Sequence, residues 1–430
     1  MTTITAAEVV DLRFPTSVML DGSDAMNPDP DYSAAYLRLH TDAELTGHGF
    51  VFTIGRGNDI QATAVASVGE RLVGRQVDGL CEHVAGLAHE LLWDSQLRWL
   101  GPDKGVIHMA IGAVINAVWD LRVRREGRPL WESLLALSPS EIVELVDWTY
   151  LSDVLDPGQA RELLEERRPN RTDRLAAVES DGLAAYTTGP GWLGYTDDKL
   201  ADLCRQAVND GFGLVKLKVG HDLGDDHRRL AIARDVLGSE VEIAVDANQR
   251  WGVDQAIEWV QALSGHDLRW VEEPTHPDDV LGHATIAEAI APIPVATGEH
   301  LANAVLAKQL LQVRGTGILQ VDATRVGGLH EQLAMLMLAA QAGVDVIPHA
   351  GGIGLCEAVQ HIAFFNAIAL AAEPGRLMLE HVDHLHEHMA APVDVRDGAY
   401  HLPRLPGSGT ALVDGVDASF GYPTGTEWSL

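Results

Sequence analysis

Apolar and polar positions follow two different patterns along the chain, and the change between them falls near residue 142. In the first part, short segments with alternating apolar and polar residues predict strands at 36–40 and 49–54. Longer stretches with an apolar residue every three or four positions predict helices at 70–97 and 105–125. Residues 1–141 are therefore expected to form an α+β domain.

From about residue 142, short apolar runs are separated by amphipathic stretches, and this unit repeats. The runs predict strands at 213–219, 241–245, 268–271, 293–296, 317–321 and 344–347. The intervening stretches predict helices, for example at 198–209, 254–264 and 330–342. Alternating strands and helices form a parallel sheet, and seven or eight such units in roughly 250 residues match the size of a TIM-type barrel. We expect this barrel over residues 142–390.

Two further segments depart from this pattern. Residues 154–180 are rich in Arg and Glu and are expected to be an insertion in an early βα connection. The segment 391–430 contains several Pro and Gly residues and is expected to pack back onto the N-terminal domain. The predicted fold class is therefore α/β: a (β/α)7β barrel with an α+β N-terminal capping domain that the C-terminal tail completes.

The charge of the chain limits its partners. The 31 basic and 62 acidic side chains give a formal net charge of −31, which repels phosphate backbones and anionic membranes. No apolar stretch approaches the roughly 20 residues of a membrane-spanning helix. We therefore expect neither nucleic acid nor a membrane as partner, and an anionic small substrate would need positive charge inside its pocket.

Compartment is indicated by the cysteines and by the first residues. The three cysteines (Cys81, Cys204 and Cys356) are far apart and form no CxxC motif, which is typical of a reducing environment. The segment 1–14 lacks the basic and continuous apolar regions of a signal peptide. These features indicate a cytoplasmic protein.

Ionisable residues stand at or just after the ends of the predicted barrel strands. Their spacings are 28, 26, 27, 23, 27 and 31 residues, about one βα unit each. Side chains at the carboxyl ends of barrel strands converge on one pocket, so these residues are predicted to share a site. They are Lys218, Asp246, Glu272, Glu299, Asp322, His349 and Glu380.

Asp246, Glu272 and Glu299 would come from three consecutive strands and supply three carboxylates. Hard oxygen ligands without Cys or His suit Mg²⁺, with Mn²⁺ as a possible substitute, whereas Zn²⁺ favours nitrogen or sulfur. Glu273 adjoins Glu272, but strand alternation would turn it to the other face. The sequence therefore predicts an Mg²⁺ site formed by the first three residues.

Lys216 and Lys218 are two of only five lysines in the chain, and they lie two positions apart on one predicted strand. Residues at this spacing point to the same face, here the barrel interior. We expect the neighbouring ammonium to lower the pKa of Lys218, so that it acts as a general base. Lys216 is then expected to bind the substrate carboxylate.

Asp322 and His349 follow adjacent predicted strands. A carboxylate that binds one imidazole nitrogen fixes the tautomer and favours the protonated ring, so His349 is predicted to be a general acid. Removal of a proton next to a carboxylate creates a second negative charge, which a divalent metal stabilises. A lysine base, a histidine acid and an Mg²⁺ site thus predict proton abstraction next to a carboxylate.

The sequence resembles the enolase superfamily, mandelate racemase group, in the motifs KLK, DANQRW, WVEEPT, TGEH, QVDATRVGG and PHAGGIGLCE. A Lys or His base that works together with Mg²⁺ is characteristic of that superfamily. Over nearly its full length the chain is also similar to L-fuconate dehydratases. This similarity rests on residues 21–36, 98–108, 186–195, 277–284 and 380–388.

The resemblance implies that Lys218 removes the C2 proton of a sugar acid and that His349 protonates the departing 3-hydroxyl. The enol would then become a 2-keto-3-deoxy acid. It also implies a set of substrate contacts from the N-terminal loop and the barrel: Gly22, Ser23, Asp24, Tyr32, Asn248 and Glu380. Gly189 stands where the resemblance leads us to expect Ser. A homo-oligomer is expected, as is common for barrels of this group.

Two motifs offer other interpretations. Residues 189–194 fit GxGxxG, but the next strand ends in lysines and lacks the acidic residue of a dinucleotide site. His381, His384, His386 and His388 have irregular spacing, so a structural or capping role is favoured over metal binding. The functional alternatives are dehydration of another sugar acid such as a galactonate, C2 epimerisation, or a catalytically idle carbohydrate-binding relative.

Overall fold

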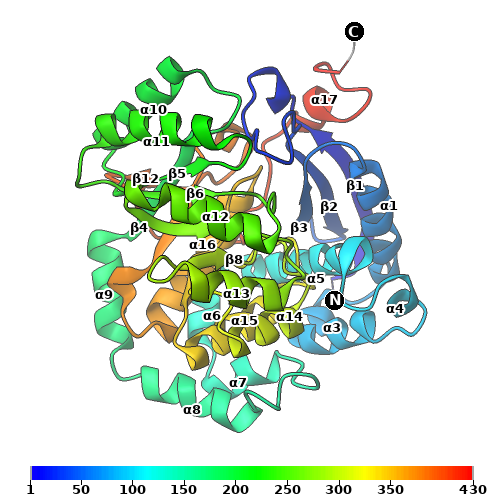
Figure 1. Cartoon of the computed structure of the whole chain (residues 1–430). Helices are drawn as coiled ribbons and strands as arrows, with labels where there is room; N and C mark the ends of the chain where they lie inside the picture. The colour runs from blue at the N-terminus through cyan, green and yellow to red at the C-terminus, as the bar shows by residue number, and fades with distance from the viewer. Residues whose placement is uncertain (1, 429–430) are drawn as a thin grey trace.

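The computed structural model describes residues 2–428. Its N-terminal part contains an antiparallel sheet in the order β1-β2-β3, formed by β1 (Ile4–Arg13), β2 (Ser33–Thr41) and β3 (Thr46–Thr53). Helix α5 (Gly105–Glu126) crosses β3 closely. The approach requires glycine at position 49, since a Cβ atom there would clash with the carbonyl oxygen of Ala113. Figure 1 shows this capping sheet beside the barrel.

Shorter helices complete the cap. The helix expected at 70–97 is broken at His83, whose backbone (φ −122°, ψ 42°) is not helical. The helices are α1 (Asn58–Gly69), α2 (Val77–Glu82), α3 (Val84–Leu92), α4 (Leu97–Leu100) and α6 (Leu130–Ala136).

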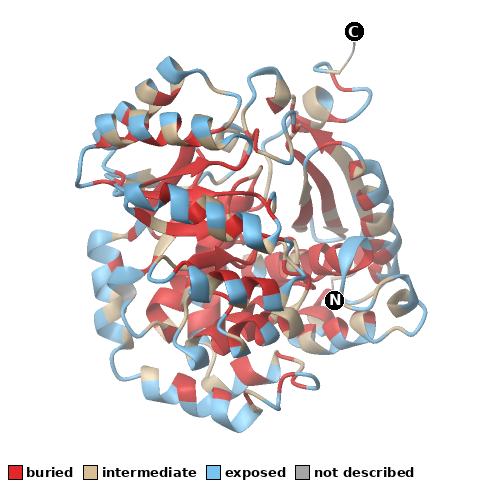
Figure 2. Cartoon of the chain, viewed as in Figure 1, coloured by how far each residue is buried: buried red, intermediate tan, exposed pale blue. Residues whose placement is uncertain are grey.

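Helix α5 is also, by length and composition alone, the one described helix apolar enough to cross a membrane. However, 83% of its apolar window is buried inside the protein, as in the core helix of a globular fold (Figure 2).

The parallel strands of the second part form the expected barrel sheet. They hydrogen-bond in the order β10-β9-β8-β7-β6-β5-β4, and β11 pairs with the other edge of β4. The strands are β4 (Leu183–Gly191), β5 (Leu214–Lys218), β6 (Glu242–Asp246), β7 (Leu268–Glu272), β8 (Val295–Thr297), β9 (Ile318–Leu319), β10 (Asp345–Val346) and β11 (Met378–His381). The register pairs Lys218 with Asp246, and Asp246 with Glu272.

Seven helices alternate with these strands, which gives the (β/α)7β arrangement that the sequence predicts. They are α10 (Asp197–Asn209), α11 (Leu223–Leu237), α12 (Val253–Leu263), α13 (Val280–Ala289), α14 (Ala304–Gln312), α15 (Leu329–Ala342) and α16 (Leu355–Phe365). Inward-facing side chains fill the barrel: Tyr186, Leu214, Ala244, Trp270, Ala296, Ile318 and Ile347. The barrel centre is therefore a packed core that supports a site at its rim.

The expectation that 154–180 is an insertion in a βα connection is wrong. These residues form two helices that precede β4, the first strand of the barrel. Asp156 and Gln159 form a capping box at the start of the first helix, which is a local signal for a helix start. The helices before β4 are α7 (Pro139–Glu144), α8 (Pro157–Arg167) and α9 (Arg171–Asp181).

The tail joins the barrel to the cap. Strand β13 (Ala399–Tyr400) pairs antiparallel with β12 (Val395–Arg396) and with β4. Further on, the Tyr36 hydroxyl donates to the carbonyl oxygen of Thr410 at 2.9 Å, and Arg38 binds Asp417 of α17 (Val416–Phe420) at 2.7 Å. These contacts confirm that the tail completes the capping domain.

Single-turn elements occupy several connections. They are the 3-10 helices Thr16–Val18, Glu70–Leu72, Ser264–His266, Pro374–Arg376 and His386–His388, and the π-helix Asn366–Leu370.

Candidate active site

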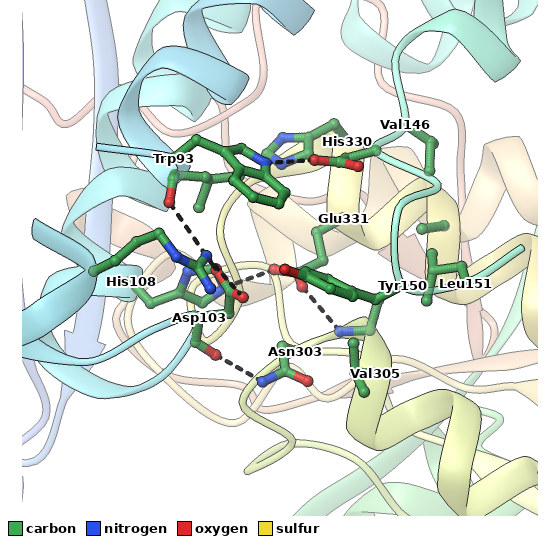
Figure 3. A pocket seen from close by; sticks show the side chains of 15 residues that line it. Trp93, Asp103, His108, Val146, Tyr150, Leu151, Asn303, Val305, His330 and Glu331 are labelled. Carbon is green, nitrogen blue, oxygen red and sulfur yellow. Dashed lines mark hydrogen bonds and ion pairs between the residues drawn. The ribbon is translucent and has the colours of Figure 1, made fainter. Parts of the chain in front are cut away.

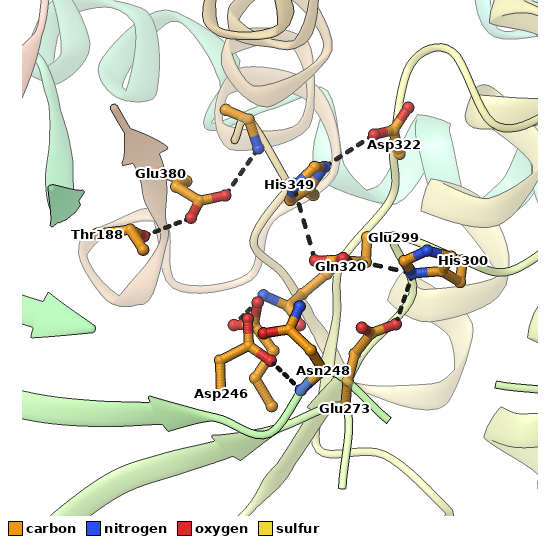
Figure 4. A network of polar contacts seen from close by, with 12 residues as sticks. Thr188, Asp246, Asn248, Glu273, Glu299, His300, Gln320, Asp322, His349 and Glu380 are labelled. Atoms are coloured by element: carbon orange, nitrogen blue, oxygen red, sulfur yellow. Dashed lines mark hydrogen bonds and ion pairs between the residues drawn. The ribbon is translucent and has the colours of Figure 1, made fainter. Parts of the chain in front are cut away.

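Three carboxylates meet at the rim of the barrel. Asp246 and Glu272 are the last residues of β6 and β7, and Glu299 follows β8. Each offers an oxygen within 4.8 Å of the other two, and all three side chains are buried. Figure 4 shows Asp246 and Glu299 in this network.

The chemistry of this donor set fits a divalent cation. Burial, followed by Asp246 and other carboxylates, raises the pKa of Glu272 to about 8 although Lys216 opposes the shift. Glu299 Oε2 and Asn248 Oδ1 are buried oxygen atoms without a hydrogen-bond partner. Buried oxygen atoms without a partner are costly, and an oxygen-liganded ion such as Mg²⁺ beside them would remove that cost.

Glu273 does not turn away as strand alternation predicts. Strand β7 ends at Glu272, and Glu273 takes a left-handed backbone (φ 42°) that brings its carboxylate to His300 Nδ1 at 3.0 Å. Gln249 Nε2 donates to both oxygens of Glu273, at 3.0 and 2.9 Å. Glu273, Glu299 and His300 thus form a second close group beside the three carboxylates.

Both predicted lysines enter the site from β5. Lys216 is wholly buried and binds Glu272, with Glu380 Oε1 at 2.9 Å. Lys218 donates to Asp246 Oδ2 at 2.5 Å and lies over the Trp192 ring, 5.4 Å from its centroid. The strand therefore delivers two ammonium groups beside the three carboxylates.

In the protein without metal, the pKa of Lys218 is raised, not lowered as the sequence predicts. Burial and Lys216 lower this pKa, but Asp246, Glu299 and Asp24 outweigh them and raise it above 10.5. The expectation took account of Lys216 alone, whereas Asp246 also contacts the Lys218 ammonium and favours its charged form. A divalent cation held by Asp246 and Glu299 would cancel much of their effect on Lys218.

His349 is held as an imidazolium on another side of the site. Its Nδ1 contacts Asp322 Oδ2 at 2.8 Å, and its Nε2 lies 3.6 Å from Glu299 Oε2. Burial lowers the pKa of His349, but Glu299 and the hydrogen bond that the ring donates to Asp322 raise it overall to about 9. The other Asp322 oxygen accepts from the Thr324 amide at 2.6 Å, which fixes the carboxylate. The predicted acid pair is therefore assembled.

Glu380 lies in β11, one residue before its end, and connects the two sides of the site. One oxygen accepts from the Thr188 hydroxyl at 2.5 Å and contacts Lys216, and the other accepts from the Ala350 amide at 2.8 Å. Although burial opposes ionisation, Lys216 and His349 lower the pKa of Glu380 to about 2. Glu380 is a charged, oriented hydrogen-bond acceptor at the cavity wall.

The loop between β1 and β2 covers the site, as expected for a capping loop. Gly22, Asp24 and Tyr32 line the cavity. Ser23 is used differently: its hydroxyl donates to the Leu20 carbonyl at 2.7 Å and accepts from the Gly194 amide at 2.9 Å. Ser23 thus ties the capping loop to the loop after β4, and its expected contact with substrate is not supported by this geometry.

The cavity has a volume of about 290 Å³ and includes residues that the sequence did not single out. Among them, Phe52, Ile54 and Met109 are apolar and come from the cap, whereas Arg56 and Arg325 add positive charge. No periodicity or spacing identifies the residues from the cap, because they reach the site only when the cap packs on the barrel. The remaining residues are Asn27, Pro30, Thr53, Trp192, His300 and Gly351.

Gly189, which stands where the resemblance leads us to expect Ser, lies outside the catalytic cavity. A Cβ atom there would lie 3.1 Å from Asp383 Oδ1 and 3.4 Å from Thr187 Oγ1, whereas the adjacent Thr188 faces Glu380. Adjacent residues of a strand point to opposite faces, so Thr188 faces Glu380 and position 189 faces Asp383. A serine at this position would therefore add nothing to the substrate lining.

The two competing motifs have structural roles. In the GxGxxG segment, buried Arg229 binds the carbonyl oxygens of Gly191 and Trp192 at 2.8 and 3.0 Å. In the histidine cluster, His386 contacts Glu357 Oε1 at 2.7 Å through Nδ1 and the Val382 carbonyl at 2.8 Å through Nε2. Both imidazole nitrogens of His386 thus have protein partners, which favours a structural role for this residue, although its ring also lies within 4.8 Å of ligand atoms of Cys356 and His381.

Comparisons with known proteins identify the family and agree with the fold. The family model of the mandelate racemase/muconate lactonizing enzyme N-terminal domain matches residues 3–135, and that of the enolase C-terminal domain matches residues 199–416. Human mitochondrial enolase superfamily member 1 is 43% identical over 99% of this chain and 97% of its own. Its crystal structure superposes with a TM-score of 0.97 and covers 99% and 98% of the two chains.

Two dehydratases are also similar. The L-galactonate dehydratase of Hypocrea jecorina is 43% identical over 99% of this chain and 96% of its own. The structure of the L-talarate dehydratase of Polaromonas sp. JS666, complexed with Mg and L-glucarate, is 25% identical with a TM-score of 0.72 and covers 97% of each chain.

Proposed function

Because the chain belongs to the mandelate racemase/muconate lactonizing enzyme family of the enolase superfamily, we propose that it is an Mg²⁺-dependent dehydratase of L-fuconate (6-deoxy-L-galactonate). The product would be 2-keto-3-deoxy-L-fuconate. The observation that carries this proposal is the placement of Lys218, at the end of β5, and of His349, in the loop after β10, in one cavity beside the carboxylate cluster. Such an arrangement can remove one proton and deliver another at neighbouring carbons.

In the proposed reaction, the substrate carboxylate lies beside Lys216 and the carboxylate cluster. Asp246, Glu272 and Glu299 would hold Mg²⁺, which would supply Lewis-acid stabilisation for negative charge on the substrate carboxylate. Lys218 Nζ takes the C2 proton. His349 then gives a proton to the 3-hydroxyl, which leaves as water, and the resulting enol becomes the 2-keto acid without any change in redox state.

The lining of the cavity supports a sugar acid with hydroxyls and an apolar end. Glu380, Asp24 and Tyr32 offer polar groups that can bind hydroxyls. Phe52, Ile54 and Met109 offer an apolar wall, which suits the C6 methyl group of a 6-deoxy acid better than a hydroxymethyl group. The likeness to the fungal L-galactonate dehydratase supports a substrate of related configuration.

The test is to incubate purified, Mg²⁺-loaded protein with L-fuconate and to follow mass and 2-keto product. We expect a product lighter by one water and a larger kcat/KM for L-fuconate than for L-galactonate. A larger kcat/KM for L-galactonate would assign that substrate instead. C2 deuterium incorporation without water loss would indicate an epimerase, and saturable binding without any turnover would indicate a catalytically idle binder.

A further inference from the structure

The basic side chains that line the catalytic cavity are, with one exception, bound to acceptors of the protein. The Arg325 guanidinium donates to the Glu299 carbonyl oxygen at 3.2 Å. The exception is Arg56, whose side chain has neither an ion pair nor a hydrogen bond within residues 2–428. The other basic residues of the lining contact carboxylates: Lys218, His300 and His349.

Arg56 lies at the edge of the cavity. A surface groove of about 630 Å³ is lined by β1, α1 and the end of the tail. Arg56 is the one described residue that lines both this groove and the catalytic cavity. Its side chain is exposed. An unpaired positive charge therefore stands at the boundary between the solvent-facing groove and the cavity.

Neighbouring arginines of the cap are neutralised by carboxylates. In the groove, Arg13 binds Asp59 at 3.4 Å. In the pocket between cap and barrel that Figure 3 shows, Arg98 binds Asp103 at 3.0 Å. Arg56 differs from both, because its guanidinium keeps all five N–H donors available for an anion, and it stays charged at any physiological pH.

The backbone that carries Arg56 is held in place. The Asp31 amide donates to the Ile54 carbonyl oxygen at 3.2 Å, and the Asn58 amide donates to the Gly55 carbonyl oxygen at 3.0 Å. Gly55 has φ 118°, a conformation that favours glycine. The turn from β3 into α1 thus fixes the position of this charge relative to the cavity.

The charge of the whole chain gives this position a purpose. A sugar acid is an anion, and the net charge of −31 repels it at long range. Lys216 is wholly buried, so it attracts the substrate carboxylate only after entry. An unpaired guanidinium at the boundary acts on an approaching anion over roughly one Debye length, about 10 Å at 0.1 M salt.

From this placement we propose that Arg56 captures the substrate carboxylate at the entrance of the catalytic cavity, and that its charge selects sugar acids over uncharged sugar derivatives of the same size. This role rests on the proposed function in one respect, that the substrate is an anionic sugar acid. Arg56 is a binding residue and takes no part in the proton transfers.

Arg314 provides a matched control. It is exposed, has no ion pair or hydrogen bond from its side chain within the described chain, and precedes β9, at the end of the barrel strands opposite the site. Arg56→Gln and Arg314→Gln therefore remove the same charge from the chain, but only the first removes it from the cavity.

Steady-state kinetics on L-fuconate give the first readout. At low ionic strength, Arg56→Gln should lower kcat/KM about fivefold, through KM, with kcat within about twofold of the wild type. The loss should shrink to less than about twofold in about 0.5 M salt, where the Debye length is a few Å. Arg56→Lys should retain most of the wild-type kcat/KM, and Arg314→Gln should match the wild type.

Binding gives a second readout that does not depend on turnover. In Mg²⁺-loaded Lys218→Met, calorimetry measures the dissociation constants of L-fuconate and of its uncharged amide. Addition of Arg56→Gln should weaken binding of the acid about fivefold and leave binding of the amide within about twofold. Equal weakening of acid and amide would overturn the proposal, because the contact would then not depend on the charge of the ligand.

The kinetics can overturn the proposal independently. At low salt, a kcat/KM of Arg56→Gln equal to that of the wild type would do so, and an equal loss in Arg314→Gln would assign the effect to net charge instead. Failure of the wild type to bind or convert L-fuconate would count against the proposed substrate. The same comparison with L-galactonate and its amide would then decide the role of Arg56.

Discussion

Lys218 and His349 reach the catalytic cavity from β5 and from the loop after β10, so the two proposed proton transfers can be separated by substitution. Lys218→Met should reduce turnover of L-fuconate by about 10²–10⁴-fold, because no other lysine contacts Asp246 as closely. The affinity for Mg²⁺, measured by calorimetry, should stay within a few fold. Turnover at the wild-type rate would show that Lys218 is not the base.

His349→Asn should separate the two steps. With Lys218 intact, the C2 proton should still exchange, so L-fuconate recovered from ²H₂O should contain deuterium while formation of the 2-keto product falls steeply. Nuclear magnetic resonance of the recovered acid and a mass assay of the product measure the two rates. If exchange and dehydration were lost together, His349 would be needed before the elimination step.

The pH dependence follows from the same imidazole. Glu299 and Asp322 raise its pKa above 6.5, and Mg²⁺ on Glu299 would cancel much of the Glu299 contribution, so the acid form is lost, and kcat/KM should fall, as the pH rises between 6.5 and about 9. The stabilising contacts of the charged ring are likewise fully present below about pH 6.5 and lost through about pH 9. Asp322→Asn removes one source of the shift without touching a metal ligand, so the alkaline limb should move to lower pH. An unchanged limb would assign it to another group.

At the scale of single elements, the strand pattern predicted which segments reach the site but not the direction of every side chain after a strand ends. Asp246 and Glu272 lie at the ends of β6 and β7, where apolar periodicity placed them. Glu273 lies one residue further, where the pleat no longer dictates direction and a left-handed backbone turns its carboxylate toward His300. The sequence also gave no sign that the Ser23 hydroxyl bonds to the backbone of Leu20 and Gly194, because a loop hydroxyl can bond to backbone as readily as to a ligand.

The capping loop offers a matched test of one element. Gly22 has φ 84°, and a Cβ atom there would lie 2.5–2.8 Å from the Tyr32 ring. Gly74 has nearly the same φ, 83°, with nothing within 4 Å of its Cβ position. Both Gly→Ala changes should therefore cost about 1–2 kcal/mol of stability from the backbone alone.

Only Gly22→Ala should also raise the KM for L-fuconate, because it displaces Tyr32 from the cavity wall. Thermal unfolding and steady-state kinetics of both variants distinguish the two effects. An equal rise of KM in the Gly74 variant would mean that general loosening of the cap, and not the Tyr32 contact, controls binding.

For the whole molecule, metal binding and stability are linked. The three buried carboxylates exist together only in the folded chain, so Mg²⁺ at 100 times its dissociation constant should stabilise the fold by about 2.7 kcal/mol. Tm should therefore rise with Mg²⁺ and fall after chelation. Glu272→Gln should lose this dependence, whereas Glu273→Gln should keep it because Glu273 contacts Gln249 and His300. The opposite result would exchange the roles of the two residues.

The overall barrel could be predicted because each βα unit carries its own local pattern. The contacts between cap and barrel could not, because residues such as Trp93 and His330 are far apart in sequence and line one pocket only when the two units dock. The same holds for Phe52 and Met109 at the catalytic cavity. A surface that forms when cap and barrel pack together produces no periodic pattern of apolar residues in either sequence segment.

The contacts between the tail and the capping sheet have a consequence for synthesis on the ribosome. Residues 33–53 emerge early, yet Tyr36 and Arg38 find their partners Thr410 and Asp417 only after the entire barrel has been translated. At roughly 5–20 residues per second, the nascent cap waits roughly 15–60 s for that final segment. During this interval its apolar surface is incompletely covered, so the growing chain should be a client of chaperones that bind near the exit tunnel.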